Sequence, residues 1–507
     1  MTLEPIQIFV FLALTALIAG VTYFYCRGAR QDSDGEREYF LAGGSLKWYF
    51  VAGSITLTNL STDQLVGMNG NQMVLLAWWE LAAVVGLCIL CFAFIPVYYK
   101  YNCTTTTELL EKRYNDRHIR ALISVLFLLG NVFIFLPAIL YGGSQFMISM
   151  FGLSAEPVNI PGFGPIDPMI FFFSLIYAMM GAAYAIFGGL RAVAVSDTFS
   201  GILLLSLALF VTFVALKAIN FDFTGIPPER LTLIGSDDSD IPFKTLFTGM
   251  LFIQIFYWST NQTITQRAMA SPSVKEAQKG ILAAAAIRLL IVPPIIVLPG
   301  IVAFKLYGRV ENDMAYGQLV GDLLPSALSG AFAAAILAAI LTTFNSILNA
   351  SAALWVCDIH ESYFDKKPNV KRLSLWVSVV MVVLSLVLVP FFATQESLIN
   401  TVQTLYGLLS MPILAAFIVG LLFKNVDARA AIIAVIFGVL FYFWMLNPLA
   451  EDASLLTQRV KLHYIHLMAI NLFSMVALAL CVNFVFFKKI AKWDAMTVFG
   501  KAPVMDT

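Results

Sequence analysis

Apolar stretches long enough to cross a lipid bilayer recur along the whole chain. A transmembrane helix needs about 20 apolar residues to cross about 30 Å of hydrocarbon. We find thirteen such windows, near residues 6–26, 48–72, 75–99, 119–151, 168–187, 192–216, 243–262, 280–304, 329–356, 374–392, 397–423, 430–448 and 464–487. With 60% hydrophobic and only 12% charged residues, the chain does not have the composition of a soluble domain. We therefore expect an all-α, multi-pass integral membrane protein embedded in the lipid bilayer.

The distribution of basic residues predicts how these helices are oriented. Positive charge is retained on the cytoplasmic side of short loops. If the N-terminus lies outside, most of the 31 Lys and Arg residues fall in cytoplasmic loops and the C-terminal tail, including Lys112, Arg113 and Lys488. Arg288 is the basic residue left inside a span. The asymmetry predicts about thirteen helices with the N-terminus out and the C-terminus in.

Polar clusters interrupt two of the predicted spans, at residues 58–64 and 259–262. Non-helical backbone and polar groups are tolerated at membrane depth only where protein or a water-filled cavity surrounds them. Interrupted helices at matching positions of two repeats are typical of secondary transporters. The spans after the first divide into two blocks of five, and each block begins with an interrupted span. Because five is odd, the blocks have opposite topology, which predicts a 5+5 inverted-repeat core.

These boundaries divide the chain into five segments. They are an N-terminal extra helix with a cytoplasmic loop (1–47), a first five-helix repeat (48–217), an extracellular loop (218–242), a second, inverted repeat (243–424), and two C-terminal helices with a cytoplasmic tail (425–507).

Several classes of function are disfavoured by the composition and the motifs. A net charge of zero and a pI near 6.9 give no reason to expect a nucleic-acid partner. The sequence has no phosphate-binding Gly-x-x-x-x-Gly-Lys-Ser/Thr motif, no His-rich metal cluster and no nucleophile constellation, so we expect neither an ATP-driven pump nor an enzyme. Transport would then be driven by an ion gradient. The short loops favour a bacterial inner (plasma) membrane.

Particular motifs carry a resemblance to a known family. The sequence is similar to the solute:sodium symporter family, and within it most closely to the sodium/glucose cotransporter branch. The resemblance rests on the run from Thr58 to Met68, the segment from Tyr184 to Ala192 with Gly188-Gly189-Leu190, Tyr257-Trp258 followed by Asn261-Gln262 and Gln266-Arg267, Ala277-Gln278-Lys279-Gly280, Pro299-Gly300, Asn345-Ser346 with Leu348-Asn349, and Asp358-Ile359. It implies a sodium-coupled symporter with an inverted-repeat core of the leucine-transporter type.

The resemblance implies sodium as the coupling ion, bound between the broken first core helix and the eighth. The matching positions are the main-chain carbonyls of Leu57, Leu60 and Ala339 and the hydroxyls of Thr342 and Thr343. Sodium is a hard cation that prefers oxygen ligands, and every one of these positions can supply an oxygen.

The resemblance also implies binding positions for a small-molecule solute, a glucose- or galactose-like monosaccharide or a related polyol. The polar positions are Asn59, Gln64, Glu80, Gln254, Arg288 and Gln403, with Tyr257 as an inner gate and Met68, Trp79 and Ile399 as apolar walls. Amides, a carboxylate and a cation suit polyol hydroxyls, which need both donors and acceptors. Arg288 occupies a position where the branch often has Lys, so the exact substrate stays open.

Three assignments remain open at this point. Glu80 and Arg288 can pair structurally without touching a solute, or Arg288 can favour a carboxylate-bearing solute such as a sugar acid. Other family substrates, an amino acid, a nucleoside or an anion, are further alternatives. Asp197 can serve a second sodium site or a sodium release path, act as a helix-start carboxylate, or pair with Arg191. Asp63 adjoins the broken helix and receives no role.

Overall fold

The computed structural model describes residues 4–27, 36–187, 189–365, 368–446 and 460–495. Gly188 of the motif noted above lies outside these ranges. The α-helices are α1 (Pro5–Arg27), α2 (Glu36–Leu41), α3 (Trp48–Asn59), α4 (Trp78–Leu81), α5 (Ala83–Ile89), α6 (Ile95–Lys100), α7 (Glu108–Tyr114), α8 (Arg117–Gly130), α9 (Leu136–Phe151), α10 (Pro168–Phe187), α11 (Leu190–Ala218), α12 (Pro228–Leu231), α13 (Gly249–Ser259), α14 (Gln262–Met269), α15 (Val274–Leu290), α16 (Val292–Tyr307), α17 (Ala315–Leu323), α18 (Ser326–Ala353), α19 (Glu361–Tyr363), α20 (Val370–Ala393), α21 (Leu398–Leu422), α22 (Ala428–Leu446) and α23 (Tyr464–Val485).

Short 3₁₀ and π segments and two small antiparallel sheets complete the described elements. The 3₁₀ segments are η1 (Ala42–Gly44), η3 (Val74–Ala77), η6 (Phe243–Phe247) and η7 (Asn312–Met314). The π segments are η2 (Asp63–Met68), η4 (Leu90–Phe94), η5 (Asn131–Phe135) and η8 (Leu354–His360). The sheets pair β1 (Val158–Ile160) with β2 (Gly164–Ile166) and β3 (Phe423–Lys424) with β4 (Lys492–Trp493).

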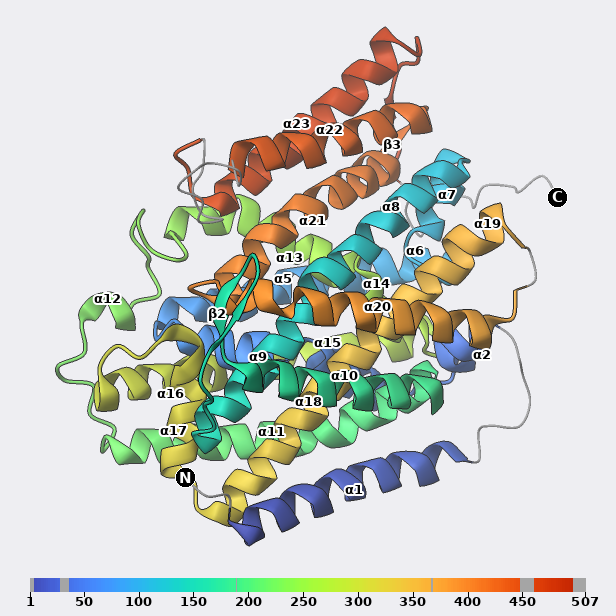
Figure 1. Cartoon of the computed structure of the whole chain (residues 1–507). Coiled ribbons are helices and arrows are strands. Elements are labelled where there is room, and N and C mark those ends of the chain that lie inside the picture. Colours follow the sequence, from blue (N-terminus) through green and yellow to red (C-terminus); the bar gives the residue numbers. More distant parts are fainter. Residues whose placement is uncertain (1–3, 28–35, 188, 366–367, 447–459, 496–507) are drawn as a thin grey trace.

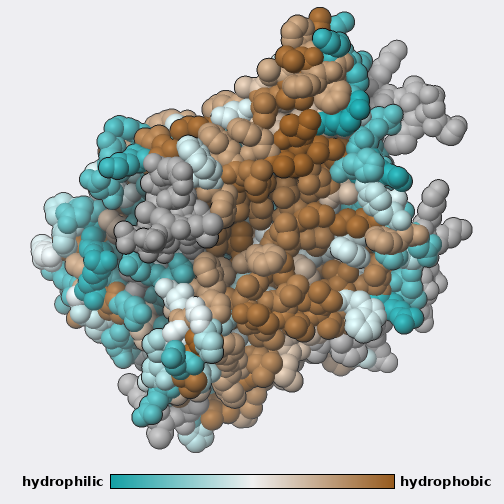
Figure 2. Space-filling model, turned by 45° about the horizontal axis from the view of Figure 1, so that its top comes forward, coloured by the Kyte–Doolittle hydropathy of each residue, from teal (hydrophilic) through white to brown (hydrophobic). Residues whose placement is uncertain are grey.

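The chain is a multi-pass integral membrane protein. Within the described ranges, ten helical segments are long and apolar enough to span a bilayer. The other three apolar windows of the sequence coincide with α3 and η2, with α10, and with η6 and α13. On the face shown in Figure 2, hydrophobic residues form a broad band, and hydrophilic residues gather at its two ends. This is the surface that a bilayer requires, because lipid tails accept no polar groups.

Both polar clusters of the sequence coincide with helix breaks. Helix α3 ends at Asn59, Leu60 leaves the helical region with φ −82° and ψ 74°, and the chain resumes as η2. Helix α13 ends at Ser259, and α14 begins after Asn261, whose side chain accepts a hydrogen bond from the Thr263 amide at 3.0 Å. The breaks lie inside the protein, because the residues around them are buried.

Helix α3 lies at the centre of the bundle and contacts α11, α14, α15 and α18. Helix α18 is rich in alanine and almost entirely buried, because small side chains let neighbouring helices approach closely. In Figure 1, α1 lies along one edge of the bundle and α22 and α23 lie along the opposite edge. Helix α1 packs on α18 and α11, and α22 and α23 pack on α21. The flanking helices thus surround a core that contains both breaks.

Two glycines allow close approaches that position the core. A Cβ atom at Gly86 would lie 2.4 Å from the Gln254 carbonyl oxygen, so α5 and α13 could not pack at this distance with any larger residue. A Cβ atom at Gly300 would lie 2.2 Å from the Asn69 carbonyl oxygen. The Gly300 amide also donates to Asn69 Oδ1 at 2.9 Å, which fixes the chain just after η2. The Pro299-Gly300 motif therefore has a packing role.

The motif carboxylate Asp358 is fully committed to structure. It is buried and accepts hydrogen bonds from Thr105 Oγ1 at 2.7 Å and from Arg120 Nε at 2.8 Å, and also from Thr107 and Ser124. These contacts join η8 to α8 and to the loop before α7. A buried carboxylate with this many donors is stabilised where it stands, because an unpaired one would be costly.

Candidate functional site

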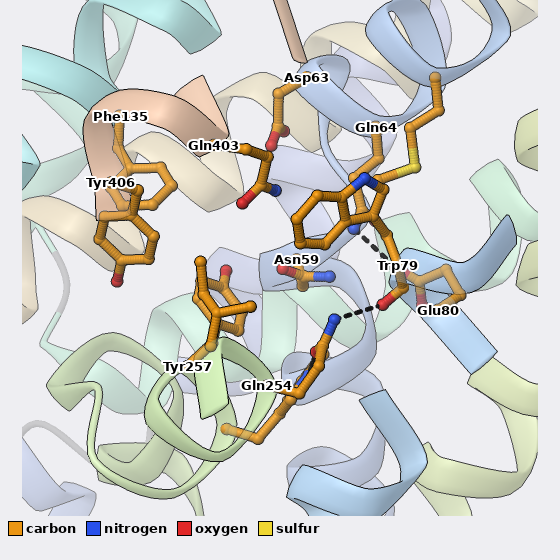
Figure 3. A pocket seen from close by; sticks show the side chains of 13 residues that line it. Asn59, Asp63, Gln64, Trp79, Glu80, Phe135, Gln254, Tyr257, Gln403 and Tyr406 are labelled. Atoms are coloured by element: carbon orange, nitrogen blue, oxygen red, sulfur yellow. Dashed lines mark hydrogen bonds between the residues drawn. The ribbon is translucent and has the colours of Figure 1, made fainter. Parts of the chain in front are cut away.

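A cavity with an empty volume of about 440 Å³ opens beside the break in α3. Its walls come from α3, η2, α4, α13, α21 and η5 (Figure 3), and the lining residues are Asn59, Asp63, Gln64, Met68, Trp79, Glu80, Phe135, Ile253, Gln254, Tyr257, Trp258, Gln403 and Tyr406. Eight of the ten solute-binding residues predicted from the sequence are among them. Their roles in binding stay predictions.

Part of the polar lining is held by contacts within the protein. Gln64 Nε2 donates to Glu80 Oε1 at 2.6 Å. Gln254 Nε2 donates to the Trp79 carbonyl at 2.9 Å, and Gln254 Oε1 accepts from Trp258 Nε1 at 2.9 Å. These bonds fix the orientation of both amides, so the cavity wall is organised before a solute arrives.

Other polar atoms of the lining have no partner among the described residues. Glu80 Oε2 and Trp79 Nε1 are buried and form no hydrogen bond. No hydrogen bond within the described chain engages the side chains of Asn59, Gln403 or Tyr257, and all three project into the cavity in Figure 3. Buried polar groups in native proteins are generally satisfied, so these donors and acceptors mark where a polar ligand or water must bind.

Arg288 and Ile399, the other two predicted residues, are not among the residues that line the cavity. The Arg288 guanidinium is fully buried behind Glu80, with Nη2 2.5 Å from Glu80 Oε1. It also donates to the Thr56 carbonyl at 3.0 Å, and its Cζ lies 4.7 Å from the centre of the Trp258 ring. Arg288 therefore orients the Glu80 carboxylate from outside the cavity. Ile399 is fully buried in the apolar core.

The predicted sodium ligands lie where α3 ends and α18 passes it. The Ser61 amide bonds to the Asn59 carbonyl at 3.0 Å, and the Gln64 amide bonds to the Ser61 carbonyl at 3.2 Å. These amides consequently do not return to the carbonyls of Leu57 and Leu60, as they would in a regular helix. The break leaves two main-chain oxygens available for a cation.

Helix α18 supplies the remaining oxygens of that set. Thr342 Oγ1 donates to the Ala339 carbonyl at 3.1 Å. The Thr343 hydroxyl is buried and has no hydrogen-bond partner in the described chain. The two helices meet here, because Thr58 Oγ1 lies 3.4 Å from Ser346 Oγ. An all-oxygen set of this kind fits a hard cation such as sodium. Binding of sodium by these residues stays a prediction.

Asp197 pairs with Arg267 and not with Arg191, which was one of the alternatives left open by the sequence. Arg191 instead contacts Glu38 at 3.5 Å and bonds to Ser45. Asp197 is also not a helix-start carboxylate, since α11 begins two turns earlier. Its Oδ2 lies 3.9 Å from Arg267 Nε and accepts hydrogen bonds from two hydroxyls of α3, those of Ser54 and Thr58.

One oxygen of the Asp197 carboxylate has no hydrogen-bond partner among the described residues. Asp197 Oδ1 and Arg267 Nη2 are both buried without a hydrogen-bond partner in the part of the chain that the structure describes. Through Thr58 the carboxylate connects to Ser346 on α18, one turn from the predicted sodium ligands. A second sodium site or a sodium release path at Asp197 stays a prediction.

The cavity includes five residues that sequence reasoning did not select: Asp63, Phe135, Ile253, Trp258 and Tyr406. Helical spacing could have found three of them. Ile253 and Trp258 adjoin selected residues on α13, and Tyr406 lies one turn beyond Gln403 on α21. Phe135 lies on η5, in a long apolar run that gives no signal for it.

Comparisons with known proteins place the chain in a family. The profile described as SSF: Sodium:solute symporter family matches residues 39–438. The uncharacterized symporter YidK of Escherichia coli (strain K12) is 32% identical over 456 residues, covering 87% of this chain and 78% of that protein. The sodium/glucose cotransporter of Vibrio parahaemolyticus is 28% identical over 490 residues, covering 87% of this chain and 85% of its own.

A solved structure shares the fold. The substrate-bound, outward-open structure of a Na⁺-coupled sialic acid symporter superposes with a TM-score of 0.79 at 19% identity, covering 97% of this chain and 100% of that one. At this identity the likeness shows the fold alone. The family profile spans most of the sequence and agrees with the motifs from which the resemblance was inferred. This chain is therefore a member of the sodium:solute symporter family, and its relatives include sodium/glucose cotransporters.

Proposed function

We propose that this chain is a secondary active symporter that carries a glucose- or galactose-like monosaccharide, or a related polyol, by alternating access. The proposal rests on the polar atoms around the cavity that have no hydrogen-bond partner among the described residues, above all Glu80 Oε2. A polyol presents hydroxyls that both donate and accept, which matches a wall of amides, a carboxylate and an indole N–H. A site built to hydrogen-bond hydroxyls also rejects analogues that lack them. The similarity to a sodium/glucose cotransporter is consistent with this substrate class.

Inward sodium flow drives uptake in this proposal. Sodium binds at the carbonyls of Leu57, Leu60 and Ala339 and the hydroxyls of Thr342 and Thr343. The break in α3 supplies ligands to this site and polar groups to the cavity, so sodium binding organises the solute site. Asp197 serves a second sodium site or the path by which sodium leaves. Tyr257 closes the inner side of the cavity and moves to release the solute.

The proposed topology has thirteen spans with the N-terminus out and the C-terminus in, in a bacterial inner membrane. Two exposed loops distinguish this orientation from its inverse. A single cysteine at Asp237 in the loop 218–242 should react with a membrane-impermeant maleimide from outside whole cells. One at Asn115, between α7 and α8, should react only after lysis. The reverse pattern would overturn the orientation and leave the fold intact.

Uptake into proteoliposomes tests the proposed function. Purified protein is reconstituted, and radiolabelled D-glucose or D-galactose is offered outside with an inward sodium gradient or with potassium in its place. We expect accumulation above equilibrium only with the sodium gradient. If neither sugar accumulates while another solute stabilises the protein in a sodium-dependent way, the sugar assignment is wrong and the ion-coupled transporter stands.

A further inference from the structure

The cavity lining includes one carboxylate, that of Asp63, with no paired cation among the described residues. The lining includes two carboxylates, Asp63 and Glu80, but no Lys, Arg or His. Glu80 is neutralised from behind by Arg288, which lies outside the lining. Asp63 forms no ion pair with any residue that the structure describes, and Ser61 Oγ donates a hydrogen bond to its Oδ1 at 2.5 Å. The formal charge that a solute meets in the cavity is therefore that of Asp63.

Asp63 is placed to touch a solute. It is half-buried, whereas most of the lining is buried, so its carboxylate reaches the space of the cavity. In Figure 3 it projects beside Gln403, on the side of the cavity away from Glu80. A solute that lies between Glu80 and Asp63 would have its polar groups near both carboxylates.

The remaining walls reinforce this preference. Aromatic rings from four segments line the cavity, those of Trp79, Phe135, Tyr257, Trp258 and Tyr406. An aromatic face attracts a cation and repels an anion through its quadrupole. Charge–charge interactions are also stronger inside a protein than in bulk water. Both effects act in the same direction, toward cationic solutes.

We propose that Asp63 is a specificity-determining residue that makes this pocket prefer a sugar carrying a protonated amino group, and exclude sugar acids. The inference rests on the proposed sugar-binding function and names the substrate class within it. Arg288 does not favour a carboxylate-bearing solute in this arrangement. It is paired with Glu80 and buried behind it, so it offers no counter-charge to a solute carboxylate.

The test compares three sugars that differ in one charged group. D-glucose, D-glucosamine and D-glucuronate compete against radiolabelled D-galactose in the proteoliposome assay. The pH is about 6.5, below the usual amine pKa of about 7.7–8.0, so glucosamine carries its ammonium group. A charge-assisted hydrogen bond exceeds a neutral one by about a factor of ten in affinity. We expect an inhibition constant about tenfold lower for glucosamine than for glucose, and a much weaker effect of glucuronate.

Substitution of Asp63 separates its charge from its shape. In Asp63→Asn the ratio of the glucose to the glucosamine inhibition constant should fall about tenfold, to near one. The inhibition constant of glucuronate should fall relative to that of glucose. Asp63→Glu should keep the preference for the amine. Asp237→Asn, at an exposed loop carboxylate, is the matched control and should leave the ratios as in the wild type. Binding titrations by the fluorescence of Trp79 and Trp258 give the same ratios if a variant does not transport.

Different outcomes would contradict the role of Asp63 and the proposed sugar symport. Sodium-driven galactose uptake with no preference for glucosamine, or a preference that survives in Asp63→Asn, would overturn the role of Asp63 and leave the sugar symporter standing. A change in sodium dependence without a change in sugar ratios would also overturn it, because Asp63 would then act on the ion. Absence of any sugar binding or uptake would instead contradict the proposed function itself.

Discussion

At the scale of single residues, Glu80 divides its two oxygens between the protein and the cavity. Oε1 accepts from Gln64 at 2.6 Å and contacts Arg288 at 2.5 Å. Oε2 is buried and has no partner among the described residues. The structural pairing and the solute-binding role are compatible in this geometry, because each uses a different oxygen.

Replacing this carboxylate should separate the two roles. We expect Glu80→Gln to abolish sugar uptake while the protein is still expressed, because the amide cannot present a charged acceptor to the solute. Loss of one charge-assisted hydrogen bond alone weakens binding by about tenfold or more. The measurement is sodium-driven uptake at matched protein amounts, with Glu229→Gln in the exposed helix α12 as the control. Unchanged uptake would remove Glu80 from the solute site.

Most of the polar residues of the cavity could be predicted from the sequence. Which of them face the cavity and which are buried behind another side chain could not. An intramembrane arginine needs a partner, and Glu80 was an available one. Whether Arg288 faces the cavity or lies behind Glu80 depends on how α15 packs against α3, which no local pattern encodes. Asp63 was passed over for a related reason. Its neighbours in the sequence are polar, and only the packed structure leaves it without a cation.

At the scale of secondary-structure elements, the broken helix α3 is the feature that the sequence predicted best. Polar residues at 58–64 are incompatible with a continuous lipid-facing helix, and the chain breaks there. The partner helix α18 gave less signal. Intramembrane threonines usually bond back to their own helix, as Thr342 does to Ala339. Thr343 does not, and this difference appears only in the structure.

Removing the free hydroxyl of α18 should weaken sodium dependence. Valine keeps the branched shape of Thr343 but supplies no oxygen. We expect Thr343→Val to raise the sodium concentration for half-maximal uptake by about tenfold or more, the cost of one ligand to a charged group. Thr212→Val is the matched control, because the Thr212 hydroxyl bonds to the Ala208 carbonyl of its own helix at 2.8 Å. Equal sodium curves for both variants would contradict the proposed site.

The segment η7 is hydrogen-bonded to the start of α21 through Asp313. Asp313 Oδ1 accepts from the Leu398 amide and Oδ2 accepts from the Tyr141 hydroxyl, each at 3.3 Å. Burial raises the pKa of Asp313 to about 7. The usual value is about 3.9, so the folded protein holds this proton more tightly than the unfolded chain does. The stability from Asp313 is thus complete below about pH 4 and is lost as the pH rises through about 7.

A neutral residue at this position should remove that pH dependence. We expect the wild type to lose thermal stability between pH 5 and pH 8, and Asp313→Asn to lose less, because asparagine does not titrate. Thermal unfolding in detergent at the two pH values measures this difference. Asp427→Asn tests a carboxylate whose pKa is lowered by Arg429 and Lys489, so it should not share the effect. If the thermal stability of Asp313→Asn fell between pH 5 and pH 8 as much as that of the wild type, other groups would be responsible for the pH dependence.

At the scale of the whole molecule, the apolar composition predicted the architecture and the helix windows matched helical segments. The exact pairing of distant elements could not be predicted from the sequence. Asp197 illustrates this, because its partner Arg267 lies 70 residues away on α14 rather than nearby at Arg191. Such contacts follow from tertiary packing and leave no periodic signature. The shared position of the two proposed sites at the break in α3 is likewise a property of the assembled bundle.

Because the two proposed sites share the break in α3, we expect sodium and solute binding to be coupled through it. Coupling of two binding equilibria is reciprocal, so each ligand must change the affinity of the other by the same factor. The most direct measurement is a titration of purified protein with D-galactose in sodium and in potassium, followed by a sodium titration with and without the sugar. We expect equal factors in the two directions, of about 5- to 150-fold. Galactose affinities that are identical in sodium and in potassium would contradict this coupling.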